Sequence, residues 1–191
     1  MKGLQLSKNK ISQKISLRDL FGVDLSGNRR LKEQIGQAII DKIVDRTASG
    51  KDVSGTPLKK YSEGYTESAA FEKYGKDKNN VDMELKGDMM EDLDIKKMTG
   101  NDITIGFNGT LSNKKAANHN GGFTLPTRQF FGVTVKDLLS IKKEFRSDIA
   151  AIRQKKKAKE EAVTLAELLT RTENESALDK LIKGLISDGE S

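Results

Sequence analysis

Two runs of alternating apolar and polar residues, separated by a tight turn, restrict the fold more than any other feature of the chain. Alternation with a period of two places one set of side chains on a single face of a β-strand. Residues 99–102 between the runs read Thr-Gly-Asn-Asp, and Gly100 takes the first central position of a two-residue turn. The sequence therefore predicts a half-buried antiparallel hairpin. The apolar positions of its strands are Leu93, Ile95, Ile103, Ile105 and Phe107.

Two other segments carry apolar residues every three or four positions, which predicts amphipathic helices. The first is expected from about residue 28 to 47, after a short helical turn at Ser16–Phe21 that Gly22 ends. The second is expected to begin after Thr134, whose hydroxyl caps it while Asp137 sits three residues on. The two apolar stripes consist of Leu31, Ile35, Ile39 and Ile43, and of Leu138, Ile141, Phe145, Ile149 and Ile152.

The remaining segments give weaker signals. The polar stretch 48–82 is expected to be a loop with at most a short helix near Ser68–Tyr74. A third strand is expected around Arg128–Val133. The last long helix is expected to continue through Lys155–Glu161, followed by two short amphipathic helices, one starting at Thr164 and one at Ser176.

These elements predict an α+β fold, in which an antiparallel sheet of three to four strands packs with long helices. Only 35% of the residues are apolar and 32% are charged, which favours a small core with long solvated helices. We expect an α+β domain over residues 1–160, with its core at about 28–152, and a helical C-terminal extension over 161–191.

The segment from Ala116 to Thr134 is the least ordinary part of the chain. It holds the only histidine, a Gly-Gly pair, one of the two prolines and a Phe-Phe-Gly run. Adjacent glycines and a proline favour irregular backbone, so we expect a rigid loop that presents a shape to a neighbouring subunit. The candidate contact or structural residues are His119, Gly121, Gly122, Pro126, Arg128, Phe130 and Phe131.

Catalytic patterns are sparse. His119 is the only available histidine base, the chain lacks cysteine, and the Gly50-Lys51 pair lacks the spacing of a phosphate-binding loop. Glu91, Asp92 and Asp94 lie close in sequence, and they suit either a divalent cation or a solvated strand face. A metal centre at His119 would need further ligands at defined spacing. We expect no enzyme activity, no cofactor and no metal, and a structural hydrogen-bonding role for His119.

The net charge of +6 is unevenly distributed. Residues 1–32 carry +6 and residues 134–160 carry +5, whereas residues 161–191 carry −4. Nucleic-acid binding is one interpretation of the basic blocks, but neither block interleaves the aromatic residues that stack on bases. A solvated helix face is the other. The candidate basic residues of the second block are Lys155, Lys156, Lys157 and Lys159.

Targeting signals do not stand out. The start of the sequence has no apolar run of signal-peptide length, and no window approaches a membrane span. Without cysteine there are neither disulfides nor thiolate metal sites, so an intracellular or reducing assembly environment is expected.

Four short motifs follow one another along the chain: Gly55–Leu58, Leu85–Leu93, Ala116–Gly122 and Pro126–Gly132. Their order and spacing resemble those of the virion-morphogenesis family of tailed bacteriophages, which includes tail-completion and head-tail joining proteins of the neck. The resemblance covers roughly residues 28–152. Thr56 stands where family members often carry Trp, and Lys115 to Ala117 replace the usual Tyr-Ala.

This resemblance implies a small α+β domain that assembles into a ring around the DNA channel. In such a ring, Lys155, Lys156, Lys157 and Lys159 are candidates to face the DNA lumen or to pair with the acidic tail between subunits or stacked rings. The implied partners are further copies of the chain, with a hexamer favoured, a head connector or stopper protein, and a tail terminator or tail-tube protein. The implied location is the virion neck or tail, with assembly in the host cytoplasm. The alternative is a nucleic-acid-binding protein that uses the N-terminal basic block and the basic block at 142–159.

Overall fold

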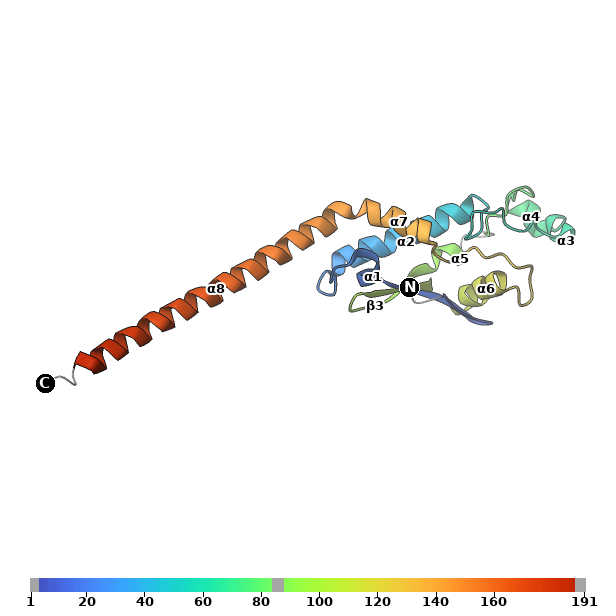
Figure 1. Cartoon of the computed structure of the whole chain (residues 1–191). Coiled ribbons are helices and arrows are strands. Elements are labelled where there is room, and N and C mark those ends of the chain that lie inside the picture. Colours follow the sequence, from blue (N-terminus) through green and yellow to red (C-terminus); the bar gives the residue numbers. More distant parts are fainter. Residues whose placement is uncertain (1–3, 84–87, 188–191) are drawn as a thin grey trace. The chain divides into compact units, whose positions relative to one another are not determined.

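The chain divides into two compact units, residues 1–146 and residues 147–191. The computed structural model describes residues 4–83 and 88–187, and at residues 88, 173 and 175–187 it describes the backbone alone. The first unit holds an antiparallel sheet with helices, and the second is formed by the long helix α8 (Arg146–Ser187), as Figure 1 shows. The predicted α+β fold is confirmed.

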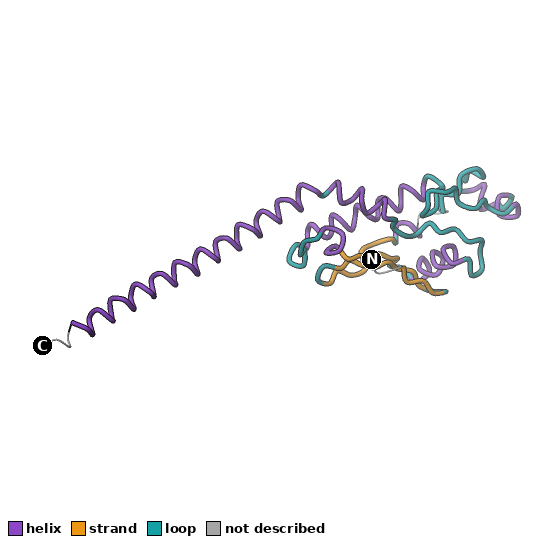
Figure 2. Tube along the Cα trace, viewed as in Figure 1, coloured by secondary structure: helices purple, strands orange, loops and turns teal. Residues whose placement is uncertain are grey.

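The sheet is built from two hairpins that pair side by side, and Figure 2 shows its strands in orange. β1 (Leu4–Ser7) pairs with β2 (Lys10–Ser16), and β3 (Leu93–Thr99) pairs with β4 (Asp102–Phe107). β2 also pairs with β4, which gives the order β1-β2-β4-β3. The second hairpin is the predicted one. Gly100 has a φ of 55°, as the first central position of its turn requires.

The first hairpin was not predicted from the sequence. Its strands are short and rich in Lys, Ser and Gln, so their alternation is weak. Pairing explains why they form. Leu6 lies opposite Ile11, and Ile15 lies opposite Ile103 of β4, so the apolar residues of the N-terminal strands extend the apolar face of the predicted hairpin.

The core lies between this apolar face and the helix α2 (Arg29–Ala48), which agrees with the helix predicted at 28–47. α2 packs against β3, β4 and α7. It approaches the sheet closely at Gly36, where an added Cβ would lie 2.4 Å from Cδ1 of Ile95. The fully buried residues of this core include Ile11, Ile35, Ile39, Ile43, Ile103, Ile105 and Phe107.

Residues 116–121 are helical, so the prediction of a loop there is wrong. It forms the end of α6 (Thr110–Gly121), which packs against β1, β2 and β4. Ala116 and Ala117 are fully buried, because small side chains let the helix approach the sheet. Of the two glycines, only Gly122 adopts the left-handed conformation that favours glycine, since it ends the helix with a φ of 66°.

The last predicted helix is divided in two. α7 (Val135–Glu144) begins with the expected capping box, in which Thr134 and Asp137 bond reciprocally, and it ends at Phe145. α8 then runs without a break to Ser187. The two short terminal helices expected at Thr164 and Ser176 are therefore parts of one helix. The boundary expected between residues 160 and 161 falls inside it.

The short elements agree in part with expectation. α1 (Leu17–Phe21) has the predicted Ser16 cap and ends at Gly22, whose φ is 66°. The polar stretch holds α4 (Ala69–Lys73), as predicted, and also α3 (Glu63–Thr66). α5 (Asp88–Glu91) precedes β3. In the part of the chain that the structure describes, no helix has both the length and the apolar character to cross a membrane.

The Ile39 side chain gives a direct test of the core. Ile39 is fully buried in α2, so Ile39→Ala is expected to lower the free energy of unfolding by about 2–5 kcal/mol through lost burial and a residual cavity. Leu111→Ala serves as the control, because Leu111 is 72% exposed and its loss is expected to cost at most about 0.5 kcal/mol. Urea unfolding of both variants measures the difference. Equal destabilisation would contradict the core described here.

Candidate functional site

The predicted third strand at Arg128–Val133 does not form. Residues 126–134, called the scaffold segment below, belong to no helix or strand. Phe130 and Phe131 within it are fully buried, with ring centroids 6.3 and 5.5 Å from that of Phe107. A buried backbone needs hydrogen-bond partners. Side chains from distant parts of the chain supply four of them, and backbone groups supply others.

Arg46, near the end of α2, supplies the donors on one side. Its Nη2 donates to the carbonyl oxygens of Phe130 (3.2 Å) and Gly132 (2.6 Å), and its Nη1 pairs with Oδ2 of Asp137 at 2.8 Å. The same Asp137 oxygen accepts from the backbone N–H of Thr134 at 2.9 Å. One guanidinium therefore ties α2, the scaffold segment and the first turn of α7 together.

Three further bonds fix the backbone of the scaffold segment. The N–H of Phe131 donates to Oδ1 of Asn120 at 3.0 Å, and the N–H of Val133 donates to Oε1 of Gln13 at 2.9 Å. The carbonyl of Gln129 accepts from the N–H of Val53 at 2.7 Å. The partners come from α6, β2 and the loop after α2, so the segment is held from three directions.

Arg128 is the only cationic residue of the scaffold segment. It is 5% exposed, and its Nε and Nη2 donate to the carbonyl oxygens of Lys59 (2.6 Å) and Lys60 (2.8 Å). The guanidinium carbon lies 5.4 Å from the ring centroid of Tyr61, a cation–π distance. Carbonyl dipoles and an aromatic face thus compensate the buried charge.

The polar stretch 48–82 is packed rather than free where it meets Arg128. The rings of Tyr61, Tyr65 and Phe71 contact one another, with centroids 5.1 to 5.7 Å apart. The hydroxyl of Tyr61 donates to Asp82 at 3.2 Å, and Lys76 pairs with the same carboxylate at 2.9 Å. Burial, reinforced by Asp82, raises the pKa of Tyr61, so this hydroxyl stays a hydrogen-bond donor.

The side chain of His119 faces the guanidinium of Arg128. Its Nδ1 lies 3.5 Å from Nη1 of Arg128, and its backbone carbonyl accepts from the N–H of Arg128 at 2.7 Å. Burial, and next the charge of Arg128, lowers the pKa of His119 to about 4. The imidazole is therefore neutral near pH 7, and Nδ1 acts as the acceptor. The residues that the structure describes contain no group of three His, Asp or Glu side chains placed to hold a metal.

The three candidate carboxylates are separated by the structure. Glu91 lies in α5, not on the strand face considered for it. Asp92 accepts from the hydroxyl of Ser112, and Asp94 accepts from Nδ2 of Asn108 at 3.0 Å. Each of these two carboxylates has a structural partner of its own.

The other predicted site residues divide into two groups. Phe130, Phe131 and Arg128 are buried in the first unit, and Gly122 abuts Thr127, whose Oγ1 would lie 2.0 Å from an added Cβ. Pro126 is exposed, Gly121 is half-buried, and Phe123 and Leu125 beside them are 40% and 42% exposed. Residues 121–134 therefore have a buried part at Arg128, Phe130 and Phe131 and an exposed rim formed by Phe123, Leu125 and Pro126.

Sequence reasoning missed Arg46, Gln13 and Asn120. A signal existed for Arg46, which continues the apolar stripe of α2 three positions after Ile43. A cation in a core-facing stripe predicts a buried partner. Asn120 likewise follows Ala116 and Ala117 on one helix face, whereas nothing in the sequence marks Gln13.

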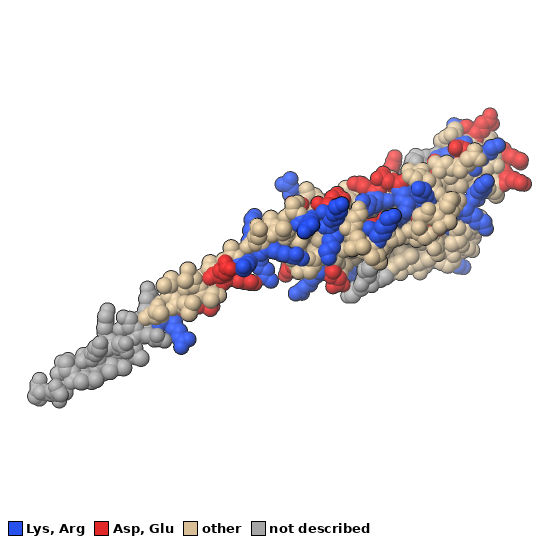
Figure 3. Space-filling view, turned by 45° about the horizontal axis from the view of Figure 1, so that its top comes forward, with Lys and Arg blue, Asp and Glu red and all other residues tan. Residues whose placement is uncertain are grey.

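The basic residues are also dispersed. Three members of the N-terminal block have structural partners: Lys14 pairs with Asp102, Arg29 pairs with Glu33, and buried Lys32 donates to two backbone carbonyls. Lys155, Lys156, Lys157 and Lys159 are all exposed on α8. On the face shown in Figure 3, Lys and Arg side chains alternate with Asp and Glu.

Arg128→Lys tests the bidentate grip on the loop at Lys59 and Lys60. A lysine ammonium cannot reproduce the planar fork, so at least one charge-assisted bond is lost, and the free energy of unfolding is expected to fall by about 1.5–3 kcal/mol. Arg30→Lys is the control, because Arg30 is exposed, and it is expected to change stability by less than about 0.5 kcal/mol. Urea unfolding compares the two. Indistinguishable midpoints would contradict the role given to Arg128.

His119 predicts a pH dependence of stability. Its pKa is about 4 in the folded chain, below the ordinary histidine value of 6.5, so the unfolded state binds the proton first as the pH falls. The free energy of unfolding is expected to be insensitive to this residue above pH 6.5 and to fall between pH 6.5 and 4, by at most about 3 kcal/mol in all. His119→Gln, which does not titrate, should lose the slope between pH 6.5 and about 5. An unchanged slope in urea unfolding would contradict the burial of a neutral imidazole.

Comparison with known proteins adds no relative: no family model matches the chain, and neither the curated proteins nor the solved structures contain a match.

Proposed function

We propose that this chain is a structural, non-enzymatic protein of a tailed-phage virion, a tail-completion or head-tail joining component that forms a ring around the DNA channel. The ring is a homo-oligomer, with a hexamer favoured. Its neighbours are a head connector or stopper protein on one side and a tail terminator or tail-tube protein on the other. The proposal starts from the resemblance in motif order described above.

The observation that carries the proposal is the use to which the motif residues are put. Arg128 of the Pro126–Gly132 motif donates to the carbonyls of Lys59 and Lys60, which follow the Gly55–Leu58 motif. Its Nη1 lies 3.5 Å from Nδ1 of His119, which belongs to the Ala116–Gly122 motif. The Arg128 guanidinium thus binds backbone carbonyls, and the His119 imidazole contacts that guanidinium rather than an open site. Such an arrangement supports a protein whose task is to keep a surface in shape.

Exposed apolar side chains on the first unit supply surfaces for subunit contact. Leu4 and Leu6 on the edge strand β1 are 40% and 39% exposed, and Val135 and Leu139 on α7 are 57% and 59% exposed. An edge strand offers unpaired backbone groups as well as side chains. Apolar groups exposed on a free subunit are typical of surfaces that become covered on assembly.

The alternative is a nucleic-acid-binding protein. It is favoured by the exposed run from Arg153 to Lys159, which holds five cationic side chains and no acidic one. Binding of duplex DNA by the isolated chain, with an affinity that falls steeply as salt rises, would distinguish this alternative. The partners already held by Lys14, Arg29 and Lys32 weaken the contribution of the N-terminal block.

Disrupting the gene in the phage that encodes the chain tests the proposal. DNA-filled heads and separate tails are expected to accumulate, and electron microscopy of the lysate counts joined and unjoined particles. Supplying the wild-type gene in trans should restore joining. Leu4→Ser combined with Leu6→Ser should not restore it, because it removes the apolar edge of β1.

Gln5→Ser is the matched control, since Gln5 lies on the same strand but on its other face. Circular dichroism and urea unfolding establish that each variant folds. Joined, infectious particles at normal yield without the gene would contradict the proposed function. Full restoration by the double leucine variant would exclude the β1 edge as a subunit contact.

A further inference from the structure

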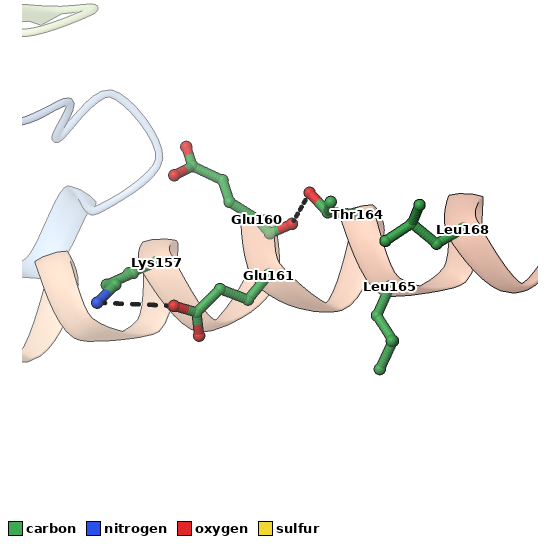
Figure 4. A pocket seen from close by; sticks show the side chains of 6 residues that line it. All are labelled: Lys157, Glu160, Glu161, Thr164, Leu165 and Leu168. Carbon is green, nitrogen blue, oxygen red and sulfur yellow. Dashed lines mark hydrogen bonds and ion pairs between the residues drawn. The ribbon is translucent and has the colours of Figure 1, made fainter.

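Helix α8 carries an exposed apolar stripe with the spacing of a coiled coil. Every side chain from Arg153 to Thr172 is exposed, and Leu165, Leu168 and Leu169 are 55% to 59% exposed. In Figure 4, Leu165 and Leu168 project from the helix, beside the ion pair between Lys157 and Glu161. The stripe follows intervals of four, three, four and three residues. Its members are Ala158, Ala162, Leu165, Leu169 and Thr172.

Such spacing fits a second helix as the partner. Intervals of three and four average 3.5 residues, which keeps the same positions facing one neighbouring helix. Ala162 and Leu169 take the a positions, and Ala158, Leu165 and Thr172 take the d positions. Leu168 flanks them at g. A helix partner is therefore better matched to this stripe than a flat surface is.

The charges of α8 and the residues after it identify the partner and its direction. Residues 153–159 hold five basic and no acidic residues, whereas residues 160–191 hold eight acidic and three basic residues, so the two segments carry +5 and −5. A parallel pair of these helices would place the basic run beside its own copy. An antiparallel pair places it beside the acidic segment. The sequence is thus self-complementary in the antiparallel direction only.

We propose that α8 pairs antiparallel with α8 of a second copy of this chain. Reversing one helix exchanges the order of the three- and four-residue intervals, so an a position faces a d position. The register that packs most leucine puts Leu165 against Leu169 of the partner and Leu168 beside its own symmetry mate. The same register brings Lys159 level with residue 173, a glutamate.

The apolar part of this contact is short, since it spans about two heptads. Pairing is therefore weak and depends on concentration and on salt. It becomes strong where other contacts already hold the copies close together. The inference does not depend on the proposed place in a phage neck, because it uses only the pattern and charge of α8.

Spin labels on the full chain test the geometry directly, since the sequence has no cysteine. One variant carries a label at Ala166, beside the proposed two-fold axis, and a second carries it at Gln154. In the antiparallel register the two Gln154 labels lie about 40 Å apart, whereas the two Ala166 labels lie within about 20 Å of each other. Short distances at both positions, or no dipolar coupling at either, would overturn the proposal.

Sedimentation equilibrium of the full chain measures the dissociation constant of the dimer, and charge variants test the proposed pairing of basic with acidic residues. Lys159→Glu is expected to raise the dissociation constant several-fold, and adding Glu173→Lys is expected to return it to within about twofold of the wild-type value. Lys136→Glu, an exposed position on α7, is the control and should leave it unchanged. Leu165→Ser with Leu169→Ser should abolish self-association through α8. Equal effects of Lys159→Glu and Lys136→Glu, or no rescue by Glu173→Lys, would overturn the proposed register.

Discussion

The fold of the first unit depends on satisfying the backbone of the scaffold segment without a neighbouring strand. Residues 126–134 carry Phe130 and Phe131 into the core, and a backbone drawn into the core with them must find hydrogen bonds there. Arg46 gives two donors to carbonyls of this segment, while Asn120 and Gln13 accept from its N–H groups. The guanidinium of Arg128 links the segment to the loop at Lys59 and Lys60 by donating to both of their carbonyls. Without these side chains, burying the two phenylalanines would leave several backbone groups unpaired.

This constraint bears on function because it makes a long irregular region rigid. The scaffold segment, α6 and the loop near Tyr61 are joined by polar contacts around two guanidinium groups. Rigid loops keep the exposed rim at Phe123 and Leu125, and the start of α7, in fixed positions. A ring component needs such fixed surfaces. A two-fold contact through α8 would add a second symmetry, and in combination with a ring it would join two rings.

The sequence predicted those elements whose signals are local. The β3–β4 hairpin follows from alternation and Gly100, α2 from its apolar stripe, and the start of α7 from the Thr134 capping box. It failed where the decisive partner is distant. β1 and β2 form because β2 pairs with β4 across about ninety residues. The scaffold segment has the alternation of a strand, yet its partners are side chains at positions 13, 46 and 120 and single backbone groups at positions 53 and 119.

The candidate site shows the same division between local and distant information. The unusual composition of residues 116–134 marked His119 and Arg128 from the sequence alone. Their neighbours, Tyr61 and the carbonyls of Lys59 and Lys60, are invisible to spacing arguments. The Gly-Gly pair and Pro126 predict a loop throughout, but only Gly122 ends a helix. Asn, His and Gly are weak helix formers, so α6 depends on tertiary packing, in which Ala116, Ala117 and Asn120 are buried as the helix packs against the sheet.

Native-state hydrogen exchange of the scaffold segment tests the central claim most directly. The amides of Phe131 and Val133 donate to the side chains of Asn120 and Gln13, so they should exchange only through global unfolding, as slowly as the amides of α2. Exchange of these two amides at the rate of an unprotected loop, with α2 still protected, would contradict the claim that side-chain hydrogen bonds hold this segment.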